Sequence, residues 1–146
     1  MREIKFRGKR TDNGEWIYGH YLEMTLCDGE GRCSYIKIDG HSPIKVIPET
    51  VGQYTGLKDK DGKEIYEGDV CEEEKTWVNK GKYFQMDDAF ENYKIRGKCE
   101  FVGSSFVARY ESLDRKGRII FQTFGLKNSI IIGNIHENPE LLTQKQ

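Results

Sequence analysis

A set of five cations, with Glu3 as the one acidic residue among them, lies near the start of the sequence. These cations are Arg2, Lys5, Arg7, Lys9 and Arg10. With Phe6 among them and Trp16 shortly after, they form a candidate strip for the phosphates of a nucleic acid. A simpler interpretation is a strand of period two, in which Ile4 and Phe6 lie on a buried face and Lys5 and Arg7 on a hydrated one.

A second candidate binding segment is residues 52–56, with the sequence GQYTG. It places Gln53 and Tyr54 between two glycines, where a closely approaching backbone and a stacking ring could hold a nucleotide base or a peptide. In the alternative, this is a tight connection whose Tyr54 ring covers the junction between the two halves of the chain.

A third candidate is residues 66–70, with the sequence YEGDV. A Gly-Asp pair that enters a strand often begins a small β barrel, and some such barrels bind RNA, DNA or peptides through their loops, so Tyr66 and Asp69 are candidate binding residues. In the alternative, Gly68 only permits a bend and Asp69 accepts hydrogen bonds from the turn backbone.

The sequence contains no motif that positions a catalytic group. No phosphate-binding GxxxxGK[ST] or GxGxxG is present, and Ser104 and Ser105 lack the GxSxG context of a nucleophile elbow. The three histidines are scattered, so we expect no metal site and no cofactor. An enzyme would need residues distant in sequence, such as Asp69, His136 and Glu137, and we therefore predict that the protein is not an enzyme.

The cysteines do not form a metal site by spacing, because no CxxC pair occurs among Cys27, Cys33, Cys71 and Cys99. We expect four unpaired thiols in a reducing compartment. A disulfide between Cys27 and Cys33 across a glycine-containing turn is the alternative.

Composition points to a small β protein. The 146 residues include 36% hydrophobic and 12% aromatic side chains with 16 glycines, a mixture that suits a thin-cored β fold better than a helical bundle. The net charge of −1 provides no global basic field. No apolar stretch is long enough to span a bilayer and the first residues lack a secretion signal, so the cytosol is the expected compartment.

Strand patterns recur along the chain between glycine turns. They cover residues 3–7, 15–26, 34–38, 64–66, 98–102, 106–110, 119–124 and 130–135. Residues 46–54 predict a bent edge strand or a half-turn because Pro48 interrupts them. Residues 72–96 are charged and aperiodic, so we expect an insertion loop there, with Glu72, Glu73 and Glu74 in solvent.

Three blocks are more specific than these patterns. They are residues 1–7 (MREIKFR), residues 48–59 and 62–70 (PETVGQYTGLKD and GKEIYEGDV), and residues 132–142 (IGNIHENPELL). Together they resemble the YopX-like family of phage and prophage proteins from Gram-positive bacteria. Two departures are Gly8-Lys9, where the family often has Ala-Trp, and the length of residues 72–96.

The resemblance implies an all-β fold with a small SH3-like barrel in the C-terminal half, an N-terminal β subdomain packed on it and little helix. We predict one domain over residues 1–146, made of a subdomain at 1–57 and a barrel at 58–146. The family also implies a homo-oligomer, and it carries over no catalytic residues. We therefore expect a non-enzymatic, self-assembling module in the bacterial cytosol that binds a phage or host macromolecule and no membrane. The alternative is a nucleic-acid-binding protein that uses Lys5, Arg7 and the barrel loops.

Overall fold

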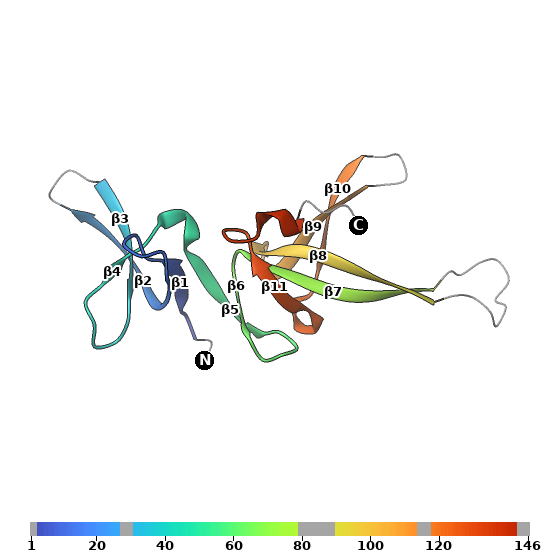
Figure 1. Ribbon diagram of the computed structural model, residues 1–146, viewed down its shortest axis with the longest axis horizontal. Coiled ribbons are helices and arrows are strands. Elements are labelled where there is room, and N and C mark those ends of the chain that lie inside the picture. Colours follow the sequence, from blue (N-terminus) through green and yellow to red (C-terminus); the bar gives the residue numbers. More distant parts are fainter. Residues whose placement is uncertain (1–2, 27–30, 79–89, 114–117, 143–146) are drawn as a thin grey trace.

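The computed structural model describes residues 3–26, 31–78, 90–113 and 118–142. Its strands form two antiparallel sheets that lie one after the other along the longest axis of the molecule (Figure 1). The prediction of an all-β chain with little helix is confirmed, because the only helical elements among the described residues are three 3-10 turns. None of the described helices is long and apolar enough to cross a membrane.

The N-terminal sheet has six strands in the order β4-β3-β2-β1-β5-β6. The strands are β1 (Phe6–Lys9), β2 (Trp16–Leu26), β3 (Gly31–Lys37), β4 (Ile44–Lys45), β5 (Gly52–Lys58) and β6 (Glu64–Tyr66). The expected half-turn at Pro48 is the 3-10 turn η1 (Pro48–Thr50), which leads into β5. At Gly52 the backbone of Glu67 comes so close that an added Cβ would lie 2.5 Å from its carbonyl oxygen, so glycine is required there.

The C-terminal sheet has five strands in the order β10-β9-β8-β7-β11. The strands are β7 (Asp69–Val78), β8 (Phe90–Val102), β9 (Ser105–Leu113), β10 (Ile119–Phe124) and β11 (Ile130–Asn134). Two 3-10 turns flank the last strand, η2 (Leu126–Asn128) and η3 (Pro139–Leu142). No pairing among the described residues closes this sheet into a barrel, so the SH3-like barrel stays a prediction, as does the division at residues 57 and 58.

A cluster of buried hydrophobic side chains packs on one face of the C-terminal sheet and includes Ile65 of β6. Its buried members are Ile65, Cys71, Ile95, Cys99, Ala108, Phe124 and Leu126. Cys99, Ala108 and Phe124 are direct neighbours across β8, β9 and β10, which fixes the register of the three strands, since a one-residue slip would turn these side chains away from the core. Cys71 and Cys99 are free thiols, as expected, whereas Cys27 of the alternative disulfide with Cys33 lies outside the described residues.

The expectation of an insertion loop at residues 72–96 is wrong for its described part. Those residues belong to β7 and β8, which pair without interruption from Val70↔Lys98 to Val78↔Phe90 and extend away from the body as a long hairpin (Figure 1). The charges obscured the strand pattern because they pair across the hairpin. Glu72 binds both Lys94 and Arg96, at 2.8 and 2.9 Å.

The expected solvation of the acidic run is also wrong for two of its three residues. Glu72 and Glu73 are buried, at 6% and 8% exposure. Each carboxylate has a cation partner, which makes its burial tolerable: Glu72 pairs with Lys94 and Arg96, and Glu73 pairs with Lys75 at 2.8 Å.

The first strand lies differently from the prediction. It spans Phe6–Lys9, Ile4 before it is 61% exposed, and Arg7 is 7% exposed. The predicted hydrated face of this strand is therefore buried at Arg7, because it packs against the second sheet.

The core predicts that Leu126 contributes much more to the free energy of unfolding than Leu57 does. Leu126 is 1% exposed and Leu57 is 39% exposed. We expect Leu126→Ala to lower the free energy of unfolding by about 2–5 kcal/mol, because it removes buried methyl groups and leaves a cavity. Leu57→Ala is the matched control and should cost far less. Urea denaturation measures both, and equal losses would show that Leu126 does not lie in a packed core.

Candidate functional site

The first strand is tied to later parts of the chain by three ion pairs. Lys5 just before the strand and Arg7 and Lys9 within it alternate along the chain and therefore share one side. The pairs are Lys5 Nζ–Glu64 Oε2 at 2.7 Å, Arg7 Nη1–Asp69 Oδ1 at 2.7 Å, and Lys9 Nζ–Glu137 Oε1 at 2.9 Å. We call these six residues the seam. The pairs to Asp69 and Glu137 join the N-terminal sheet to β7 and to the segment after β11.

Arg7 occupies the centre of the seam. Its guanidinium lies between the rings of Trp16 and Tyr66, 4.7 and 5.1 Å from the two ring centroids. Its Nη2 donates a hydrogen bond to the backbone oxygen of Glu67 at 3.1 Å. Since the side chains of Arg7 and Asp69 are 8% and 3% exposed, this is a buried ion pair between two aromatic walls.

Asp69 is held by the turn that precedes it. Gly68 has a φ of +82°, which glycine adopts without strain, and the N–H of Tyr66 donates to Asp69 Oδ2 at 2.8 Å. Burial raises the pKa of Asp69, while the charge of Arg7 and the Tyr66 amide act in the opposite direction. The predicted turn role of Gly68 and Asp69 is therefore observed, and the carboxylate also has a cation partner.

A second cluster surrounds Glu64. Lys5 and the hydroxyl of Tyr66 both donate to its carboxylate, at 2.7 and 2.9 Å. Burial alone would raise the pKa of Glu64, but these two hydrogen bonds, together with the charges of Lys5 and Lys58, hold the pKa below its usual value. Burial and the bond to Glu64 raise the pKa of the Tyr66 hydroxyl. The Nζ of Lys5 also lies over the ring of Tyr54, 5.1 Å from its centroid.

A third cluster surrounds Glu137. Its carboxylate accepts hydrogen bonds from Trp16 Nε1 at 2.9 Å and from Asn134 Nδ2 at 2.8 Å, in addition to the pair with Lys9. These contacts lower the pKa of Glu137 to about 2. His136 lies against Trp16, with ring centroids 6.0 Å apart, and burial followed by the charge of Arg7 lowers its pKa.

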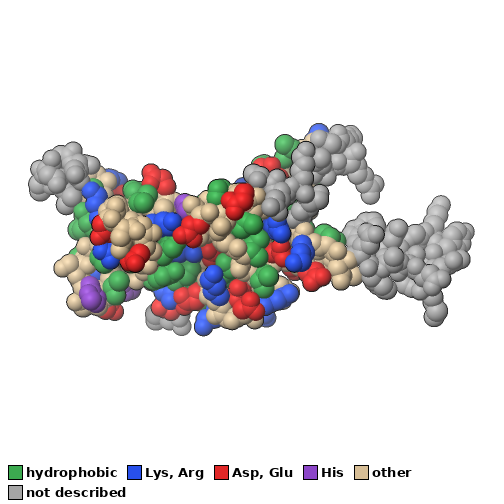
Figure 2. All heavy atoms as spheres, viewed as in Figure 1, with side chains coloured by type: hydrophobic (Ala, Val, Ile, Leu, Met, Phe, Trp, Pro, Cys, Tyr) green, Lys and Arg blue, Asp and Glu red, His purple; other side chains and the backbone are tan. Residues whose placement is uncertain are grey.

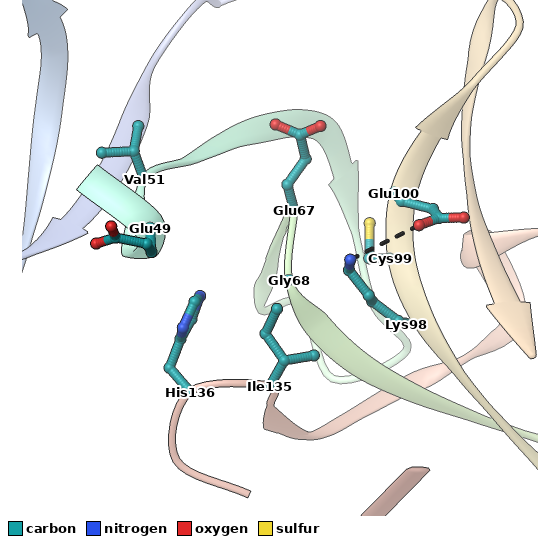
Figure 3. Close-up of a pocket in the computed structure, with 9 residues that line it drawn as sticks. All are labelled: Glu49, Val51, Glu67, Gly68, Lys98, Cys99, Glu100, Ile135 and His136. Atoms are coloured by element: carbon teal, nitrogen blue, oxygen red, sulfur yellow. Dashed lines mark ion pairs between the residues drawn. The ribbon is translucent and has the colours of Figure 1, made fainter. Parts of the chain in front are cut away.

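A shallow hollow of about 210 Å³ opens beside the seam (Figure 3). Its lining residues are Glu49, Val51, Glu67, Gly68, Lys98, Cys99, Glu100, Ile135 and His136. Carboxylates and cations are mixed in this lining, and Lys98 approaches Glu100 at 3.7 Å. The charges therefore do not converge on one ligand group of a single sign.

The titratable groups of the hollow are poorly suited to nucleophilic or metal chemistry. Burial raises the pKa of the Cys99 thiol, which keeps it protonated, whereas a nucleophilic cysteine needs a lowered pKa. Over the described part of the chain, no three His, Cys, Asp or Glu side chains are placed to hold a metal ion. Asp69 and Glu137 of the enzymatic alternative are each bound to a cation.

The structure brings the predicted site residues close together, and among them Arg7 and Asp69 pair directly. Lys5, Arg7 and Asp69 are seam residues, and the ring of Tyr54 lies 5.4 Å from that of Tyr66. At 7% and 2% exposure, these two rings have no face open to a base. The backbone N–H of Gln53 donates to Glu67 Oε2 at 3.0 Å.

Sequence reasoning missed the partners of these residues. Glu64, Trp16 and Glu137 bind the predicted cations, but nothing in their local spacing indicates it. A usable signal was the alternation of Lys5, Arg7 and Lys9, together with carboxylates in the two later blocks of specific sequence.

The chain belongs to the YopX family, whose model, described as "YopX protein", matches residues 5–143. Among solved structures it is similar to the crystal structure of protein EF1440 from Enterococcus faecalis. The two share 22% sequence identity, the comparison covers 97% of this chain and 99% of that one, and the TM-score is 0.44. No curated protein sequence matches the chain.

The seam predicts that Arg7 contributes much more to the free energy of unfolding than Arg10 does. We expect Arg7→Met to lower the free energy of unfolding by about 3–5 kcal/mol, because it leaves the buried Asp69 carboxylate without its cation. Arg10→Met is the control, since Arg10 pairs with Asp12 at the surface and should matter little. Chemical denaturation measures both, and a small loss at Arg7 would contradict a structural role for the buried pair.

Glu137 predicts a pH dependence. Its folded pKa of about 2 lies below the ordinary value of 4.5, so the ionised carboxylate stabilises the fold above about pH 4.5, and that contribution is lost as the pH falls from 4.5 toward 2. Wild type should therefore be more stable than Glu137→Gln at neutral pH, and the two should converge near pH 2. Denaturation midpoints over this range measure the difference, with Glu49→Gln as an exposed control. A difference that does not change with pH would refute the assignment.

Proposed function

We propose that the protein is a non-enzymatic, self-assembling module that acts by binding a phage or host macromolecule in the cytosol of a bacterial cell. The observation that carries the proposal is the distribution of its side chains. The ionic groups of the seam are paired internally, whereas several large apolar side chains of β8 and β10 face solvent. They are Tyr93, Phe101, Val102, Ile119 and Phe121.

These exposed side chains are ordered by their neighbours. Phe101 contacts Phe106 edge to face, with ring centroids 5.0 Å apart, and the guanidinium of Arg109 lies 4.1 Å from the centroid of Phe121. The strand register places Phe101 on the same face as Ala108 and Phe121 on the opposite face. Both faces of this part of the sheet therefore offer ordered apolar groups to a protein partner.

The order of the C-terminal strands supports an SH3-like unit within this proposal. Strands β7 to β10 follow one another as an antiparallel meander, and after the 3-10 turn η2 the last strand, β11, returns to pair with β7. Small β units of this kind commonly act as binding modules rather than as enzymes, although the fold alone does not define a ligand.

The alternative of a nucleic-acid-binding protein loses its main support. Its proposed cations Lys5 and Arg7 are bound to Glu64 and Asp69, so their charge is already compensated. Figure 2 shows Lys and Arg side chains intermingled with Asp and Glu across the visible face. A nucleic acid would instead require a strip of uncompensated positive charge.

Light scattering of the purified protein at low and high concentration tests the proposal. We expect the apparent mass to rise with concentration and the protein to show no salt-dependent binding of labelled single- or double-stranded nucleic acid. A monomer at all concentrations would refute self-assembly. Nucleic-acid binding that falls steeply with salt would favour the alternative. Wild type is the right protein for this test, because we expect Arg7 variants to destabilise the fold.

A further inference from the structure

The two sheets end in four edge strands, and three of them are protected against pairing with another chain. β4 has two residues and β6 has three. β11 carries an irregularity between Ile131 and Gly133, and its Ile131 N–H donates to Asp59 Oδ2 at 3.1 Å. Short length, bulges and local capping are the devices by which natural proteins block edge pairing.

The fourth edge strand, β10, has none of these devices. Its six residues, IIFQTF, contain no charge, no proline and no glycine. It pairs with β9 over its whole length without a shift in register. Ile119 and Phe121 are 65% and 58% exposed. Figure 1 shows the β9–β10 hairpin projecting from the body, with no described strand on the free side of β10.

We propose that β10 is the edge through which two copies of the chain pair, as antiparallel strands related by a twofold axis. This inference rests on the self-assembly proposed above and names the surface responsible. An unprotected, uncharged edge is a template for strand addition, and a twofold arrangement uses the same strand on both copies.

The sequence of β10 is compatible with pairing to the same strand of a second copy. With Phe121 opposite Phe121 across the axis, Ile119 lies opposite Thr123, so the apolar outer faces of the two sheets become continuous. Phe124 is buried and Phe121 is exposed, which shows that residues 119, 121 and 123 share the outer face. The two strands contribute no like charges that would oppose each other.

The nearest charges do not oppose this pairing. The guanidinium of Arg109, 4.1 Å from the centroid of Phe121, is already paired with Glu100 at 3.0 Å. Glu111 is the neighbour of Phe121 on β9, so the two Glu111 side chains would be three strand spacings apart, roughly 14 Å. This exceeds the Debye length of about 8 Å at physiological ionic strength, and their repulsion is therefore screened. The result would be a continuous sheet of both copies, with Phe121 at its centre.

The test compares one substitution at two exposed phenylalanines. Phe121→Lys places like charges opposite each other at the proposed axis, whereas Phe101→Lys changes a ring of similar exposure (52%) on β8, which is not an edge strand. We expect Phe121→Lys to raise the dimer dissociation constant about tenfold or more and Phe101→Lys to change it little. Sedimentation velocity measures both constants, and circular dichroism verifies that each variant is folded.

Hydrogen exchange of wild type provides a measurement without substitution. Strand addition protects the amides of β10 that point away from β9, so alternate amides between Ile119 and Phe124 should exchange more slowly at high concentration. Assembly with unchanged β10 exchange, or with equal effects of the two substitutions, would overturn the proposal and leave self-assembly standing. A wild-type monomer at all concentrations would overturn both.

Discussion

The arrangement of this protein depends on the buried ion pair between Arg7 and Asp69. Taking two charges out of water is costly, and a buried pair repays that cost only where geometry and additional hydrogen bonds are good. Here the Tyr66 amide, the Glu67 carbonyl and the rings of Trp16 and Tyr66 supply those contacts. Because Arg7 belongs to β1 and Asp69 to β7, each sheet completes the environment of a charge on the other.

The same constraint explains why the residues with the strongest chemical character are unavailable for a ligand. Lys5, Tyr54 and Tyr66 are engaged around Glu64, and Lys9 and Trp16 around Glu137. These polar groups would have to break their present contacts to bind anything else, and for the buried pair of Arg7 and Asp69 that would also leave a desolvated charge without its partner. Under the proposed function, binding therefore falls to surfaces away from the seam, where large apolar side chains are exposed.

The edge strands of the two sheets differ in how well they are protected against pairing with another chain. An antiparallel sheet that does not close leaves backbone donors and acceptors along its outer strands, and most proteins protect these strands. In this chain the protections lie on β4, β6 and β11, next to charged or capped segments, while β10 consists of uncharged residues with high β propensity. The long β7–β8 hairpin differs from β10 because it carries many charges. Some of these charges pair across its two strands, as Glu72 does with Lys94 and Arg96.

The sequence by itself determined the fold class, the position of most strands and the family. Period-two patterns and glycine turns depend on neighbours along the chain, and a reader of the sequence sees those neighbours directly. The strands at residues 98–102, 106–110 and 119–124 were predictable because their alternation and turns are local.

Only the tertiary structure decided which polar residues are buried. Arg7 looked hydrated and Glu72 looked solvated because each is charged, and a charge is expected in water unless a partner compensates it. The partners, Asp69 for Arg7 and Lys94 with Arg96 for Glu72, are brought close only when the strands pair and the sheets pack. Burial of a charge is a property of the pair, and the pair does not exist until the chain has folded.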